Sequence, residues 1–152
     1  MLYLMRLNAL PAVRYVAILL FSLVLSSPLY AQTENEVYCY IKKAGIKHPE
    51  VVLKQAIYES GHFKSNIFKK RNNLFGFRHN KYIVFDSWQS CIDYYKRWQD
   101  KYYKDDSIEY YKFLQHRNFS GRLKFRYDTQ LKHTKIKDDL VCLDDKNENT
   151  KQ

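Results

Sequence analysis

The stretch from Pro49 to Gly61 constrains the fold most, because the signals for both ends of a helix fall inside it. Pro49 suits the first turn of a helix, and the pair Ser60-Gly61 ends one. The apolar residues between them recur with the period of a helix that buries one face: Val52, Leu53, Ala56 and Ile57. The pattern predicts a helix whose last turn carries the carboxyl group of Glu59.

Similar patterns predict helices along much of the remaining chain. The clearest follows Ser87, a suitable N-cap, and its apolar and aromatic positions recur at steps of three and four: Trp88, Cys91, Ile92, Tyr95, Trp98 and Tyr102. We interpret this aromatic stripe as core packing. Further helices are expected over residues 34–44, 107–116 and 123–136, whereas residues 62–71 form a loop or a short helix.

A small β element is expected between the second and third long helices. Residues 74–78 and 81–85 are predicted to be short strands joined by His79-Asn80, because Asn tolerates the left-handed conformation that a tight turn needs. The expected fold class is therefore α+β and mainly helical, with one small β-hairpin.

The two ends of the chain differ in composition from its middle. Arg6 and Arg14 accompany an apolar stretch over residues 15–25, and Ala31 offers a small residue for cleavage, which together are typical of a signal peptide. An uncleaved membrane anchor is the alternative. Residues 144–152 are polar without apolar periodicity and are expected to be a disordered tail. Residues 32–143 then form one domain, expected to be periplasmic or secreted.

The charge balance narrows the class of partner without choosing one. The chain has a formal net charge of +10, which suits an anionic partner such as cell wall, an acidic glycan or nucleic acid. Lysines that solvate helix faces would also explain much of this excess. The 14 Tyr and 9 Phe fall largely at core spacing instead of interleaving with basic residues along one face. Together with export, this spacing argues against a nucleic-acid binder.

Three cysteines bear on the redox state of the domain. Cys39 and Cys142 lie near its two ends, and a disulfide between them would close a loop of about 100 residues, worth roughly 4–5 kcal/mol in the entropic picture. Cys91 falls on the apolar stripe of a predicted helix and is expected to be a buried thiol. The cysteine spacing matches no metal site, and no metal or cofactor is expected.

Glu59 is the candidate acid for cleavage of a glycosidic bond. Such an acid must stay protonated near neutral pH, and both removal from water and the negative end of a helix raise a carboxyl pKa. Most glycosidases add a second carboxylate, for which Asp86 and Asp93 are candidates; the acetamido oxygen of the substrate is the alternative. Glu59 could instead be solvated or pair with Lys64 or Arg71.

Three motifs together resemble the glucosaminidase domain of glycoside hydrolase family 73, most closely its short secreted forms. They are HPEVVLKQAIYESG at residues 48–61, NNLFG at residues 72–76 and YIVFDSWQSCIDY at residues 82–94. The resemblance implies a lysozyme-like fold with the hairpin beside a cleft. It also implies hydrolysis of the β-1,4 bond after N-acetylglucosamine in peptidoglycan strands, by a monomer that binds no nucleic acid and, after cleavage, no membrane.

The same resemblance assigns roles to individual residues. The family's catalytic acid corresponds to Glu59, and the substrate-binding positions correspond to Asn73, Phe75, Gly76 and Tyr94, with Tyr127 in place of a later Tyr. The chain lacks an Asp-Pro pair common near that later Tyr, and it has no clear counterpart of the second carboxylate found in longer members. A domain that binds peptidoglycan with little or no activity is therefore the alternative function.

Overall fold

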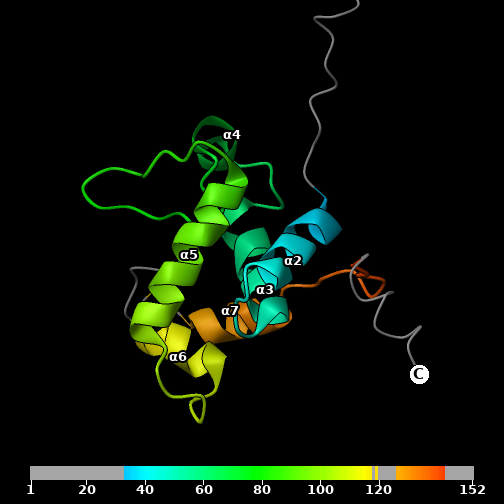
Figure 1. Ribbon diagram of the computed structural model, residues 1–152, viewed down its shortest axis with the longest axis vertical. Helices are drawn as coiled ribbons and strands as arrows, with labels where there is room; N and C mark the ends of the chain where they lie inside the picture. The colour runs from blue at the N-terminus through cyan, green and yellow to red at the C-terminus, as the bar shows by residue number, and fades with distance from the viewer. Residues whose placement is uncertain (1–32, 118, 120–125, 143–152) are drawn as a thin grey trace, which may run out of the picture. The chain divides into compact units, whose positions relative to one another are not determined.

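The computed structural model describes residues 33–117, 119 and 126–142, all of them within the expected domain (Figure 1). The expected signal peptide, residues 1–31, and the expected tail, residues 144–152, lie outside the described residues. The described part is mainly helical. Its helices are α2 (Glu34–Lys43), α3 (Pro49–Ser60), α4 (Asn66–Arg71), α5 (Trp88–Tyr102), α6 (Tyr110–His116) and α7 (Tyr127–His133).

Local signals set the ends of the long helices, and those at Gly61 and Ser87 were predicted from the sequence. The hydroxyl of Thr33 accepts from the backbone N–H of Glu36 at the start of α2, and Ser87 accepts from Ser90 in the same way at the start of α5. Gly61 ends α3 with a left-handed backbone, φ 57°, which glycine adopts without steric cost. The predicted helices over residues 49–60 and after Ser87 are confirmed.

The last two helices are shorter than expected. α6 begins at Tyr110 because the preceding residues form a turn, in which a side-chain oxygen of Asp105 accepts from the backbone N–H of Ser107 at 2.9 Å. α7 ends at His133, after which the backbone at Thr134 is extended. Residues 123–125, where the last helix was expected to begin, lie outside the described part of the chain.

The predicted β-hairpin is wrong as a pair of strands. Residues 72–87 do reverse direction, but within the described residues the only β pairing is a single bridge between Arg78 and Tyr82. The side chain of buried Asn73 replaces a strand ladder. Its Nδ2 donates to the carbonyls of Phe77 at 2.8 Å and Ile83 at 2.9 Å, and its Oδ1 accepts from the N–H of Phe77 at 2.9 Å. We call this segment, residues 72–87, the 72–87 loop.

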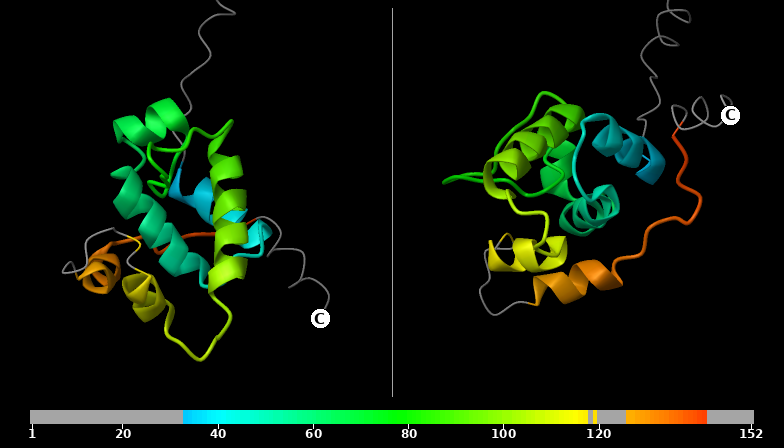
Figure 2. Two further views of the ribbon diagram at one scale, coloured as in Figure 1. Left: turned by 90° about the vertical axis from the view of Figure 1, so that its left-hand side faces the viewer. Right: turned by 60° about the horizontal axis from the view of Figure 1, so that its bottom comes forward.

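The core forms where the helices bury their apolar stripes against one another. α3 packs against α2 on one side and α7 on another, while α6 packs against α7 (Figure 2). All four residues of the predicted stripe of α3 are completely buried, and the α5 stripe contributes Cys91, Ile92 and Tyr95. Of the rest of that stripe, Trp88 and Trp98 pack against the core while partly buried, whereas Tyr102 is exposed, so core packing is confirmed except at the last position.

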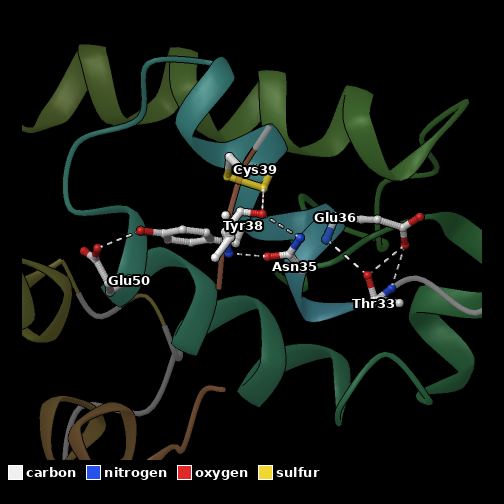
Figure 3. Close-up of a disulfide and its surroundings, with 8 residues drawn as sticks. Thr33, Asn35, Glu36, Tyr38, Cys39 and Glu50 are labelled. Carbon is white, nitrogen blue, oxygen red and sulfur yellow. Dashed lines mark hydrogen bonds between the residues drawn. A yellow bond between two sulfur atoms is a disulfide. The ribbon is translucent and has the colours of Figure 1, made fainter. Parts of the chain in front are cut away.

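The segment after α7 returns to α2 and is fastened there (Figure 3). The predicted disulfide between Cys39 and Cys142 is confirmed, and Cys91 is a buried free thiol. Asn35 on α2 exchanges two hydrogen bonds with the backbone of Val141, at 3.0 and 2.9 Å. The backbone N–H of Lys137 also donates to a carboxyl oxygen of Glu34 at 3.1 Å. Residues 134–142 thus form a strap held at its far end.

Candidate active site

Glu59 lies in the last turn of α3 and is half-buried, with a partner on a helix far along the chain. The hydroxyl of Tyr127, in the first turn of α7, donates to Oε1 of Glu59 at 2.7 Å across a sequence separation of 68 residues. The contact of α7 with α3 brings these residues together. Tyr127 is completely buried, so its hydroxyl has little freedom to leave this position.

The 72–87 loop meets the other oxygen of the same carboxyl group. Gly76 has a left-handed backbone, φ 66°, and a Cβ built on it would lie 3.5 Å from Oε2 of Glu59. A side chain at this position would be strained by the positive φ, although its Cβ would make only an ordinary van der Waals contact with Oε2. Tyr127 therefore occupies one side of the carboxyl group, and a residue without a side chain borders the other.

Burial sets the protonation of Glu59. Removal from water raises the pKa of Glu59 above its ordinary value, while the hydroxyl of Tyr127 and the positive charge of Arg78 act in the lowering direction. Of the two causes expected from sequence, burial is the one that raises the pKa of Glu59 here. The alternative partners lie elsewhere: Arg71 reaches the carbonyl of Tyr82 at 3.4 Å, and Lys64 is exposed.

A buried chain of polar groups stands behind Tyr127. Gln55, one turn before Glu59 on α3, is completely buried, and its Oε1 accepts from the hydroxyl of Tyr95 at 2.7 Å. The hydroxyls of Tyr95 and Tyr110 lie 2.7 Å apart. Burial raises the pKa of the Tyr127 hydroxyl well above its ordinary value, and the side chain of Gln55 acts in the lowering direction. The Nε2 of Gln55 itself has no hydrogen-bond partner among the described residues.

The sequence patterns did not single out Gln55 as a site residue. The available signal was its position, since residues four apart on a helix share a face and Gln55 is a polar residue beside a predicted apolar stripe. Its partner on α5, Tyr95, cannot be read from that spacing.

Within the NNLFG motif Gly76 borders Glu59, whereas the three residues before Gly76 are buried. Asn73 holds the 72–87 loop together, and Phe75 is buried with its ring centroid 4.4 Å from that of Tyr95. Tyr94 is partly buried and packs against Phe77, with ring centroids 4.8 Å apart. Direct contact of these residues with a substrate stays a prediction.

The two candidate second carboxyl groups have different surroundings. Asp86 is exposed at the end of the 72–87 loop, where its backbone carbonyl accepts from Nδ2 of Asn72 at 3.2 Å. Both carboxyl oxygens of Asp93 lie 3.3 Å from the hydroxyl of Tyr40, a contact that joins α5 to α2. Asp93 therefore has a structural partner, and Asp86 stays the candidate that the sequence favoured.

Two further features bear on the class of protein. Within the described residues, no three side chains of His, Cys, Asp or Glu are grouped closely enough to hold a metal ion. None of the described helices has the length and apolar character needed to cross a membrane.

The fold and site define a mainly helical domain with one shielded carboxyl group at a helix end. The family model described as mannosyl-glycoprotein endo-beta-N-acetylglucosaminidase matches residues 34–146. The chain therefore belongs to this glucosaminidase family, as the three sequence motifs indicated. Comparisons with curated proteins and with solved structures gave no match.

Proposed function

We propose that the protein is a peptidoglycan hydrolase, an endo-β-N-acetylglucosaminidase that cleaves the β-1,4 bond after N-acetylglucosamine. The description of its family names an endo-β-N-acetylglucosaminidase. The observation that carries the proposal is the half-buried carboxyl group of Glu59, whose pKa is raised by burial at the end of α3. A carboxylic acid that stays protonated is what departure of a sugar oxygen requires.

In this proposal the two oxygens of Glu59 have different tasks. Tyr127 donates to Oε1, so the acidic proton lies on Oε2, beside Gly76. That proton passes to the glycosidic oxygen as the bond to the anomeric carbon breaks, and Glu59 is left as a carboxylate. The hydroxyl of Tyr127 then stabilises the new negative charge, because hydrogen bonds to charged groups are the stronger ones.

A second group must meet the positive charge that develops at the anomeric carbon. Asp86 is the protein's candidate, because it lies at the far end of the loop whose Gly76 borders Glu59. An acetamido oxygen of the substrate is the alternative, and it would need no second carboxylate. Asn73, Phe75 and Tyr94 would support the sugar-binding surface from below.

The other parts of the proposal follow from the substrate. A peptidoglycan hydrolase works outside the cytoplasm, in agreement with the signal-like residues 1–31 and the basic composition. We expect the mature domain to act as a monomer with a lysozyme-like cleft and without nucleic acid, membrane or cofactor. The alternative is a domain of the same fold that binds peptidoglycan without cleaving it.

The deciding experiment is digestion of purified peptidoglycan, with mass analysis of the released fragments. We expect new reducing ends on N-acetylglucosamine, and none with Glu59→Gln, which keeps the shape of the side chain and removes its acidic proton. A reducing end on the other sugar would reject the proposed bond. Co-sedimentation with peptidoglycan without cleavage would favour the binding domain.

A further inference from the structure

Two adjoining cavities lie between α3 and the strap that leaves α7. One has a volume of about 470 Å³ and is lined by Ile57, Tyr58, His62, His133, Thr134 and Lys135. The other, of about 770 Å³, shares the last three of these residues and continues along α3 to Lys54 and Glu50. Both volumes fall within the roughly 300–1,000 Å³ of ligand-sized sites. We call the two together the α3 trough.

Contacts on both sides hold the walls of the α3 trough in place. One wall is α3 itself, which packs against α2. The other wall is the start of the strap, and the far end of the strap is joined to α2 by the disulfide of Cys142 and the hydrogen bonds of Val141 (Figure 3). The backbone N–H of Lys137 adds a bond to Glu34 nearer the middle of the strap. The trough is therefore a fixed feature of the domain.

The lining of the α3 trough favours negatively charged ligands. In the smaller cavity the ionisable side chains other than tyrosine are Lys135, His62 and His133, and no described carboxyl group lines it. The larger cavity adds two lysines and two acids, of which Glu50 accepts a hydrogen bond from Tyr38 at 2.9 Å. Lysines outnumber carboxyl groups in the linings of both cavities, one to none in the smaller and three to two in the larger. Of the three, Lys132 is also paired with Glu109 at 3.2 Å, which leaves Lys54 and Lys135 as the lysines available to a ligand.

The end of the trough that includes Tyr58 adjoins the candidate active site. Tyr58 is the neighbour of Glu59 in sequence, and consecutive Cα atoms lie about 3.8 Å apart. The exposed ring of Tyr58 also meets the ring of Tyr127, with centroids 6.0 Å apart. Tyr58 therefore borders the trough and also contacts the tyrosine that donates to Glu59. A four-residue peptide spans about 13 Å, the scale on which one ligand could contact both places.

We propose that the α3 trough binds the short acidic peptide that peptidoglycan carries on its sugars, while the glycan strand lies at Glu59. The proposal rests on the proposed function and names the part of the substrate recognised beyond the sugars. Carboxylates of the peptide would meet Lys135, Lys54 and the two histidines, and its apolar side chains would contact Ile57 and Tyr58. Part of the positive charge of the chain would then serve to bind this peptide.

The test compares glycan strands that carry their peptides with the same strands after an amidase has removed them. We expect the wild-type kcat/KM to be about five- to tenfold higher on the peptide-bearing strands, as two partly exposed charge contacts would give. In the double variant Lys54→Gln/Lys135→Gln this ratio falls towards one. The matched control is Lys43→Gln/Lys104→Gln, which removes the same charge from exposed sites outside the trough and keeps the ratio.

A binding measurement separates this inference from the proposed function. The peptide released by the amidase, fluorescently labelled, is titrated with the wild-type protein and with both double variants. Weaker binding by the trough variant alone supports the inference even if no strand is cleaved. Equal kcat/KM on both kinds of strand, or equal binding of the peptide by both variants, would overturn it. Equally tight binding of inorganic polyphosphate would overturn it too, because the trough would then be a general anion site.

Discussion

Two regions of the molecule each carry a carboxyl group that the sequence singles out. One region is the corner where α7 packs on α3, and the other is the 72–87 loop. In the corner, Glu59 is half-buried, hydrogen-bonded to a completely buried tyrosine, and its pKa is raised. In the loop, Asp86 is exposed and contributes a backbone carbonyl to the internal bonding of the loop. Both residues are candidates by their positions in the sequence motifs. Their different burial in the folded domain is what distinguishes them.

The largest effect should come from the corner. Glu59→Gln should lower the rate of peptidoglycan cleavage by roughly 10²–10⁴-fold, the contribution typical of a positioned acid. Reducing-end release at the optimum pH measures it, with circular dichroism to verify folding. A variant that retains a tenth of the activity would show that the buried carboxyl group is not the acid.

The next effect concerns the stability of the loop. Asn73→Ala leaves the carbonyl of Ile83 and the N–H of Phe77 without their side-chain partner, whereas the carbonyl of Phe77 still accepts from the N–H of Ile83 at 3.0 Å. Both unpaired groups are partly buried, and a buried unpaired group costs about 1–3 kcal/mol. We expect the free energy of unfolding in urea to fall by about 2–4 kcal/mol. Asn80→Ala, at an exposed position in the same loop, is the control and should change it little. Equal effects would mean that Asn73 does not hold the loop.

The same two regions show how far the sequence predicts the fold. Pro49, Gly61 and Ser87 act on the backbone next to them, so the ends of α3 and the start of α5 could be read directly. Asn73 could not be read in this way, because it bonds to carbonyls up to ten residues away and so replaces a strand ladder with one side chain. The sequence pattern of residues 74–85 does not show that a side chain takes the place of strand pairing.

The candidate site divides in a similar way. Glu59 was found from its position at a helix end, and Tyr127 from the resemblance to a family. The bond between them spans 68 residues and depends on how α7 packs on α3, a tertiary fact that no local pattern contains. Gln55 was missed for the same reason, because its partner Tyr95 lies 40 residues later.

Removing the hydroxyl of Tyr127 tests whether its hydrogen bond helps to set the pKa of Glu59. That hydroxyl donates to Glu59 and acts to lower its pKa, so Tyr127→Phe should raise the pKa of Glu59 further. An acid catalyst loses activity as pH rises through its pKa, and the alkaline limb of kcat/KM should therefore move to higher pH. Loss of a hydrogen bond to a charged group should also lower kcat by roughly 10- to 30-fold.

Two outcomes would revise this view of the corner. An unmoved alkaline limb would mean that Tyr127 does not act on the titrating group. Tyr58→Phe is the control, since the ring of Tyr58 contacts that of Tyr127. Within the described residues, the hydrogen bond to Glu59 comes from the hydroxyl of Tyr127 and not from that of Tyr58. The control should leave the limb in place.

The smallest effect should come from Asp86. An exposed carboxyl group interacts with a developing charge through solvent, where ion pairs are worth about 0–1 kcal/mol. The neutral acetamido oxygen of the substrate can instead bond to the anomeric carbon as the glycosidic bond breaks. Asp86→Asn should therefore lower kcat by only about three- to tenfold, measured on peptidoglycan beside Asp105→Asn, an exposed acid on the α5–α6 connection. A loss as large as that of Glu59→Gln would mean that substrate binding encloses Asp86. Glu59 and Asp86 would then act together as the two carboxyl groups of the reaction. Their difference in burial would exist only in the protein without substrate.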